Sequence, residues 1–232
     1  MLILYSYQLV DEKEFKGFLE EVQNELPSSV LEKVNSFKYP NDQQRSLIAD
    51  LMVRLFYLQK LNLGMKDIEY EYGIHDKPLL KDWEKEFFNI SHSGNHVVVV
   101  FSDQQVGVDV EAIKKDRRKI AQRFFTDSEI EAMNALPDKD LQIRYFYQLW
   151  TLKESYMKAI GDGMTMSLSS FAFNQKEEVF ELLFSKYDRD WKFYSTLWQT
   201  DAFLSICSKY REPDLHFHLD LKKIRSLFPS KA

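Results

Sequence analysis

The fold is decided around residues 97–111, which read VVVVFSDQQVGVDVE. Two segments, Val97 to Phe101 and Val106 to Val110, have the composition of strands. The polar residues 103–105 between them predict a hairpin turn. On both sides of this turn the hydrophobic spacing indicates helices followed by strands, an order that is typical of α+β proteins.

The elements predicted on the two sides follow one plan. The first side shows a strand at 3–9, helices over 11–25, from 27 and from 40 to about 63, and strands at 68–72 and 87–91. The second side shows helices over 117–124, 128–136 and 140–160, and strands around 171–173, 179–184, 191–198 and 202–207. We therefore predict a pseudo-duplicated α+β monomer with two halves, 1–105 and 106–232, each with helices packed on a small antiparallel sheet. A ligand is expected in the cleft between the halves.

Composition narrows the class of protein. Hydrophobic residues make up 44% and charged residues 29% of the 232 residues, as in a folded domain that needs no disulfide. The only cysteine, Cys207, lies in an apolar run and is predicted to be a buried thiol. A net charge of -5 without a basic stripe argues against a nucleic-acid partner. The chain shows neither a signal peptide nor an apolar run near the roughly 20 residues of a membrane helix, so a cytoplasmic protein without a membrane partner is expected.

The first candidate site residues are two alternating carboxylates. Asp109 and Glu111 are two positions apart on a predicted strand, so they share one face. Neighbouring like charges repel and require either full solvation or a bound cation. Mg²⁺ suits such a pair, because it combines a few carboxylates with water and phosphate oxygens. For an isolated pair, a solvated strand face is the commoner interpretation.

Two further segments strengthen this hypothesis. Glu154 and Lys158 are four positions apart on a predicted helix and share a face, an arrangement that alone is common on protein surfaces. Residues 89–94, which read NISHSG, place hydroxyl, imidazole and glycine groups at a strand end, as a phosphate site requires. A purely structural role for His92 is the alternative.

Together these segments resemble the motifs of 4′-phosphopantetheinyl transferases of the surfactin-synthetase-activating type. The motifs correspond to residues 88–94 (FNISHSG), 107–111 (GVDVE) and 146–158 (FYQLWTLKESYMK). The resemblance implies an Mg²⁺-dependent enzyme that moves the phosphopantetheine arm of coenzyme A onto a serine of an apo acyl or peptidyl carrier protein and releases 3′,5′-adenosine bisphosphate. Carriers of nonribosomal peptide (antibiotic-type), polyketide and fatty-acid synthases are all left open.

The resemblance also implies a role for individual residues. Asp109, Glu111 and Glu154 are implied to hold Mg²⁺, and Lys158 to lie near the reacting phosphate. The residues implied to bind coenzyme A are Lys33, Arg45, Ser46, Lys77, Ser91, His92 and Lys158. Among these, His92 is implied to contact the 3′-phosphate.

The chain departs from the family pattern at three positions. Ser46 replaces a threonine, and Asp76 replaces the glycine of a Gly-Lys-Pro element, where glycine adopts backbone angles that aspartate disfavours. Val30 stands where relatives often have a lysine, and Lys38 is an alternative source of that charge. For Arg45, an ion pair with Asp42 is an alternative to ligand contact.

The serine proton of the carrier needs an acceptor. Glu154, a metal-bound water, Glu129 and neutral Lys158 are the candidates, so Glu154, Lys158 and Glu129 are predicted as catalytic residues. The segment 124–129, FFTDSE, resembles a family element, but Thr126 and Glu129 also have the spacing of a helix capping box. The two roles of Glu129 are equally supported.

Docking and rival functions complete the sequence-based hypotheses. The basic run 117–119 with Arg123, followed by Phe124 and Phe125, is a candidate docking surface for an acidic carrier, with a solvated helix face as the alternative. An Mg²⁺-dependent nucleotide phosphohydrolase would use the same carboxylates, whereas a non-catalytic carrier-binding module would not need them. A serine hydrolase is excluded, because no G-x-S-x-G surrounds Ser91 or Ser93.

Overall fold

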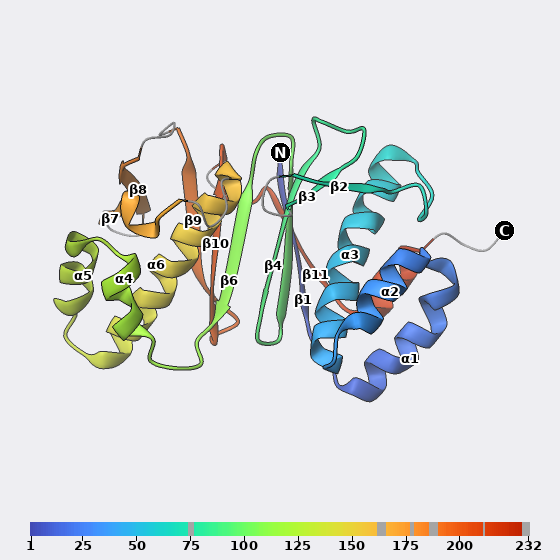
Figure 1. The fold of residues 1–232 in the computed structure, drawn as a ribbon, viewed down its shortest axis with the longest axis horizontal. Coiled ribbons are helices and arrows are strands. Elements are labelled where there is room, and N and C mark those ends of the chain that lie inside the picture. The colour runs from blue at the N-terminus through green and yellow to red at the C-terminus, as the bar shows by residue number, and fades with distance from the viewer. Residues whose placement is uncertain (74–76, 162–165, 177–178, 186–189, 211, 229–232) are drawn as a thin grey trace.

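A computed structural model describes residues 1–73, 77–161, 166–176, 179–185, 190–210 and 212–228, and its strands lie in the middle with helices at both ends (Figure 1). The first half contains β1 (Leu2–Gln8), α1 (Glu12–Val22), η1 (Gln23–Glu25), α2 (Ser28–Ser36), α3 (Pro40–Leu61), β2 (Tyr70–Tyr72), β3 (Pro78–Leu80), β4 (Phe87–Ser93) and β5 (His96–Ser102). The chain continues with β6 (Gly107–Ala112), η3 (Arg118–Ile120), α4 (Ala121–Phe124), α5 (Asp127–Asn134), α6 (Lys139–Ile160), η5 (Leu168–Ser170), β7 (Ala172–Lys176), β8 (Val179–Phe184), β9 (Lys192–Trp198), β10 (Ala202–Ser208), β11 (Leu215–Leu219) and α7 (Leu221–Ser226). This order confirms the α+β architecture with two similar halves.

The two long helices begin and end where their sequences dictate. Helix α3 starts with Pro40, whose missing N–H is harmless in a first turn, and stops at Asn62 in the left-handed conformation. Helix α6 starts after Asp138, whose side chain accepts from the backbone N–H of Leu141. It ends at Gly161, with φ 87°. These helices carry the residues of the candidate site.

The main sheets have the strand orders β11-β1-β5-β4 and β6-β10-β9, and β2-β3 and β7-β8 form two short hairpins. The predicted hairpin at residues 103–105 is wrong, because β5 pairs with β1 and β4 while β6 pairs with β10. A strand has only two edges, and both edges of β5 are occupied. Residues 103–105 therefore connect two sheets.

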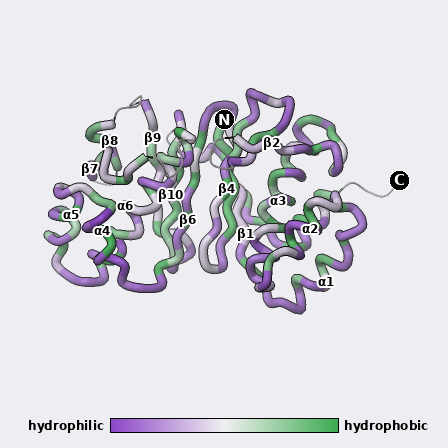
Figure 2. Tube along the Cα trace, viewed as in Figure 1, coloured by the Kyte–Doolittle hydropathy of each residue, from purple (hydrophilic) through white to green (hydrophobic). Residues whose placement is uncertain are grey.

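Strand β5 is buried on both faces, which explains its unbroken apolar sequence. Val97, Val99 and Phe101 pack in the core around α3. Val98 and Val100 face a second core, shared with β6 and β10 of the other half. Hydrophobic segments appear on these central strands as well as on the helices at both ends (Figure 2). The halves are thus joined by a continuous apolar layer.

The C-terminal elements return to the first half. Strand β11 pairs with β1 in parallel, so this sheet is mixed rather than purely antiparallel. Leu221 and Ile224 of α7 fill the core around α3. Strand β11 and helix α7, the last elements of the chain, therefore lie with the elements of the first half.

Two smaller predictions can also be compared with the structure. Cys207 is buried and free, as predicted. Within the described ranges, no helix combines the length and the apolar character that a membrane crossing needs.

Candidate active site

Strands β4 and β6 lie side by side at the junction of the halves (Figure 1), a contact that we call the β4–β6 seam. The backbone N–H groups of Val108 and Val110 donate to Asn89 Oδ1 (2.8 Å) and Ser91 Oγ (3.2 Å). The N–H of Ala112 donates to Ser93 Oγ (3.2 Å). Alternate side chains of one strand thus meet alternate N–H groups of the other. The polar segment 89–93 joins the two sheets.

Two glycines allow the close approach at this junction. A Cβ on Gly107 would lie 2.0 Å from the carbonyl oxygen of Ser155, so β6 packs directly on α6. Gly94 has φ +59°, and a Cβ there would lie 2.8 Å from that of Ala112. The glycines of two motifs therefore bring β4, β6 and α6 together.

The seam cavity is a hollow of about 370 Å³ beside these three elements. Its lining includes the predicted site residues Ser91, His92, Asp109, Glu111, Glu154 and Lys158. The structure thus brings all three carboxylates predicted as metal ligands to one cavity. Trp150 also lines it. Trp150 was not singled out from the sequence; its place one helical turn before Glu154 is the signal that could have identified it.

The seam cavity holds more negative than positive charge. Lys158 Nζ lies 2.7 Å from Asp109 Oδ1 and 3.2 Å from both Ser91 Oγ and the carbonyl oxygen of Val108. Burial raises the pKa of Glu154, and the Asp109 carboxylate raises it further. Burial also raises the pKa of Glu111, to which Asp109 adds. One ammonium faces three carboxylates, so an additional cation is favoured.

The donor set fits a hard divalent cation in its chemistry. Asp109 Oδ2 is buried and has no hydrogen-bond partner among the described residues. Carboxylate oxygens in excess of positive charge are the ligands that Mg²⁺ takes. In the present side-chain arrangement, no three His, Cys, Asp or Glu residues of the described ranges are grouped closely enough to hold a metal ion. In this arrangement the Lys158 ammonium provides the positive charge beside Asp109.

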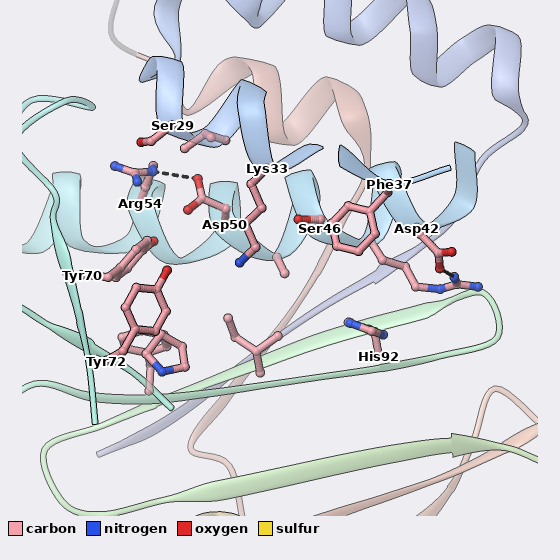
Figure 3. Close-up of a pocket in the computed structure, with 16 residues that line it drawn as sticks. Ser29, Lys33, Phe37, Asp42, Ser46, Asp50, Arg54, Tyr70, Tyr72 and His92 are labelled. Atoms are coloured by element: carbon pink, nitrogen blue, oxygen red, sulfur yellow. Dashed lines mark hydrogen bonds and ion pairs between the residues drawn. The ribbon is translucent and has the colours of Figure 1, made fainter. Parts of the chain in front are cut away.

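A second hollow of about 310 Å³, the α3 cavity, lies between α2, α3 and β4. It includes Lys33, Arg45, Ser46 and His92, and it shares Ile90 and His92 with the seam cavity. Figure 3 shows Lys33 extending from α2 toward the hollow, with Ser46 and His92 at its border. The two cavities are therefore adjacent.

Arg45 and His92 occupy the boundary between the cavities. Arg45 forms an ion pair with Asp42 and donates from Nε and Nη2 to the carbonyl oxygen of Gly94, at 3.0 and 2.6 Å. The predicted structural alternative for Arg45 is thus present. Partial removal from water lowers the pKa of His92, and the charges of Arg45 and Lys158 lower it further.

Two predicted lysines lie elsewhere. Lys77 lines neither the seam cavity nor the α3 cavity; its Nζ donates to the carbonyl oxygen of Lys158 (2.7 Å), across the halves. Burial lowers the pKa of Lys77 to about 8. Lys38 is exposed and lies 5.5 Å from the ring centre of Tyr39. Asp76 lies outside the described residues.

Glu129 is not brought to the seam cavity. It is completely buried, 2.9 Å from Lys153 Nζ, which also donates to the carbonyl oxygens of Leu168 and Phe171. Its carboxylate completes the capping box with Thr126. These contacts support the structural role of Glu129 as part of a helix cap. Lys153 was not singled out from the sequence, since a lysine on a helix is usually exposed.

The predicted docking residues have mixed environments. Arg118 is held by Asp116, at 2.8 Å between Nη2 and Oδ2. Arg123 lies 5.3 Å from the ring centre of Phe124, which contacts Trp150 edge-on. Phe125 is buried in the core around α6.

Comparisons with known proteins point to one family over most of the chain. A family model for the N-terminal part of 4′-phosphopantetheinyl transferases matches residues 11–105, and the 4′-phosphopantetheinyl transferase superfamily model matches 105–207. The 4′-phosphopantetheinyl transferase psf-1 of Bacillus pumilus is 30% identical over 177 residues, which cover 75% of this chain and 76% of that protein. This chain belongs to the 4′-phosphopantetheinyl transferase family. The resemblance drawn from the three motifs is confirmed.

Other members of the transferase family match over shorter stretches. Sfp of Bacillus subtilis is 38% identical over 61% of this chain and 62% of its own length. Gsp of Aneurinibacillus migulanus is 38% identical over 67% of this chain and 66% of its own. The chain thus spans just under two thirds of these relatives. A solved holo-[acyl-carrier-protein] synthase of Thermotoga maritima has a TM-score of 0.38 and 19% identity, covering 44% of this chain and 61% of its own.

Proposed function

We propose that this chain transfers the 4′-phosphopantetheine arm of coenzyme A to a serine of an apo acyl or peptidyl carrier protein. The observation that carries the proposal is the seam cavity, where Asp109, Glu111, Glu154 and Lys158 meet although they come from separate sequence segments. Membership of the transferase family supports the same activity. The adjacent α3 cavity supplies cations for a phosphate-rich nucleotide.

The nucleotide end of coenzyme A is proposed to bind in the α3 cavity. Lys33 and His92 supply charge and a ring N–H for phosphate, and the Ser46 hydroxyl supplies a further hydrogen bond. Arg45, fixed by Asp42 and the Gly94 carbonyl, adds positive potential at the boundary to the seam cavity. The diphosphate then extends toward Lys158 and Ser91.

Asp109, Glu111 and Glu154 are proposed to hold a Mg²⁺ ion. When bound, this ion neutralises negative charge on the diphosphate oxygens. Support comes from the unpartnered Asp109 Oδ2 and from the mutual repulsion of the carboxylates. Lys158 is proposed to stabilise the charge that develops on the transferred phosphate and its leaving group.

The transfer itself makes one bond and breaks one. The carrier serine oxygen bonds to the phosphorus on the pantetheine side, and the bond from that phosphorus to the bridging diphosphate oxygen breaks. 3′,5′-Adenosine bisphosphate leaves with the bridging oxygen. Glu154 is the proton acceptor that we propose, because it lines the cavity beside Lys158, whereas Asp109 and Glu111 each already accept a hydrogen bond from a serine of β4.

The division of the chain is part of the proposal. Residues 1–105 provide the nucleotide side and 106–232 the carboxylates and Lys158, a division supported by the two family models that meet at residue 105. One chain contributes both sides of the seam cavity, so a monomer suffices. We propose that this monomer works in the cytoplasm, where coenzyme A and apo-carriers meet.

The carrier is proposed to dock beside Trp150. This residue lines the seam cavity and contacts Phe124, whose neighbour Arg123 is basic. Ile120 is 36% exposed on the same segment. A carrier with an acidic helix would meet both apolar and basic groups there.

Intact-mass spectrometry tests the proposal. Purified apo-carriers incubated with coenzyme A and Mg²⁺ are expected to gain one phosphopantetheine. The gain should be lost for Asp109→Ala and Glu154→Ala and kept for Glu69→Ala, a control that removes an exposed carboxylate paired with Lys81. Release of adenosine bisphosphate without a carrier would instead indicate a phosphohydrolase, and carrier binding without mass gain a non-catalytic module.

A further inference from the structure

Ser93 makes two hydrogen bonds whose direction is fixed by chemistry. Its Oγ lies 2.7 Å from Glu111 Oε2 and 3.2 Å from the backbone nitrogen of Ala112. A backbone N–H only donates, and a hydroxyl has a single proton. The Ser93 hydroxyl therefore accepts from Ala112 and donates to the Glu111 carboxylate.

The same arrangement recurs two residues earlier. Ser91 Oγ donates to Asp109 Oδ1 (2.9 Å) and accepts from the N–H of Val110. It also accepts from Lys158 Nζ, so its hydrogen-bonding capacity is full. Each carboxylate of β6 is thus tied to a serine of β4, in the same two-residue register.

Asn89, the first member of this series, differs in one respect. Its Oδ1 accepts from the N–H of Val108 (2.8 Å), as the two serines do from their own partners. An amide oxygen carries no proton, so Asn89 Oδ1 cannot pass the contact on to a carboxylate as the two serine hydroxyls do. The seam therefore contains one polar contact that joins the halves without reaching Asp109 or Glu111.

We infer that Ser93 is a positioning residue that holds the Glu111 carboxylate in the orientation needed by the cation of the seam cavity. Glu111 is only half-buried and has three rotatable side-chain bonds, so its direction is not set by packing alone. The hydroxyl occupies Oε2 and fixes the carboxylate relative to the backbone of both strands. Partners of this kind orient metal ligands, and their loss weakens metal binding about 10- to 100-fold.

This inference rests on the proposed function, because it assumes the cation site. Its test measures binding rather than transfer. Mn²⁺ serves as the probe, since it takes the same oxygen ligands as Mg²⁺ and its free fraction is measured by electron paramagnetic resonance. The whole chain is titrated with Mn²⁺, alone and with coenzyme A.

Three variants separate positioning from a structural contribution. Ser93→Ala should weaken Mn²⁺ binding about 10- to 100-fold, and Ser93→Thr, which keeps the hydroxyl, should restore it. Asn89→Ala loses an equivalent bond across the seam and should lower the melting temperature without changing Mn²⁺ affinity. Thermal melting of each variant without metal confirms that it is folded.

The outcomes distinguish the inference from the proposed function. Unchanged Mn²⁺ affinity in Ser93→Ala, an equal loss in Asn89→Ala, or a loss in Ser93→Thr equal to that in Ser93→Ala would each overturn the role of Ser93 while leaving the cation site intact. A wild-type chain that binds no Mn²⁺ under either condition would overturn both. A wild-type chain that binds Mn²⁺ but never modifies a carrier would overturn the transfer function and leave Ser93 to be judged by the binding data.

Discussion

Replacing Gly107 by alanine should separate β6 from α6. The new Cβ would lie 2.0 Å from the carbonyl oxygen of Ser155 and 2.4 Å from the nitrogen of Ala159. Ordinary contact needs about 3.5 Å, so the strand and helix must move apart by about 1.5 Å. Both obstructing atoms are backbone and cannot rotate away.

The size of the effect follows from this clash. Overpacking by one methyl group costs about 1–3 kcal/mol, and the upper end applies because neither element yields. For a chain of this size each kcal/mol lowers the melting temperature by about 2–4 °C. We expect Gly107→Ala to lower it by about 6–12 °C. It should also reduce the proposed transfer at least about 100-fold, because a displacement of about 1 Å or more misplaces Asp109 and Glu111 against Glu154.

Differential scanning fluorimetry and urea unfolding measure this loss. Gly17→Ala is the matched control, because Gly17 lies within α1 and a Cβ there meets nothing within 4 Å. That change should stabilise the protein by about 0.5–1 kcal/mol. A melting temperature of Gly107→Ala within about 2 °C of the wild type would refute the steric reasoning.

Three further predictions concern titratable groups. Glu129→Gln should cost about 3–5 kcal/mol in urea unfolding, because it leaves the buried Lys153 ammonium without its charged partner. Adding Lys153→Met should restore part of this loss, since the carbonyl oxygens of Leu168 and Phe171 then lose their donor, and should keep the proposed transfer. A folded but inactive double variant would support a catalytic role of Glu129. The pKa of Lys77 in the folded chain, about 8, is below its ordinary 10.5. Between these two pH values the unfolded chain therefore binds more protons than the folded chain, so the unfolding free energy rises with pH. Urea titrations of Lys77→Met should show a smaller rise between about pH 8 and 10 than the wild type. The pKa of His92 is held below 6.5 by its surroundings. It should rise when 3′,5′-adenosine bisphosphate binds, because a nearby phosphate favours the charged ring. An unchanged pKa of His92 in a nuclear magnetic resonance titration would argue against phosphate at this ring.

Local patterns predicted the elements whose partners are near in sequence or whose periodicity is strong. Helices α3 and α6 have apolar spacing on a buried face, and β5 is a short apolar run bounded by polar residues. The grouping of Asp109, Glu111 and Glu154 required more, because no local rule places a strand beside a distant helix. The resemblance of the three motifs supplied that information.

The missed features depend on pairing and on partners far along the chain. The hairpin at 103–105 failed because sequence does not reveal that β1 and β4 occupy both edges of β5. Strand β11 was missed since its partner β1 begins some two hundred positions earlier in the chain. Glu129 fitted both a capping box and a proton relay, and only its burial against Lys153 separated them.

The return of β11 and α7 to the first half has a consequence for synthesis. A nascent chain that has emerged only to residue 105 contains β1, β5 and β4 but lacks β11, which pairs with the second edge of β1. It also lacks Leu221 and Ile224, which fill the core around α3. The first sheet and its core can therefore be completed only once residues 215–226 are available. An isolated fragment 1–105 should expose an unpaired β1 edge and associate through it.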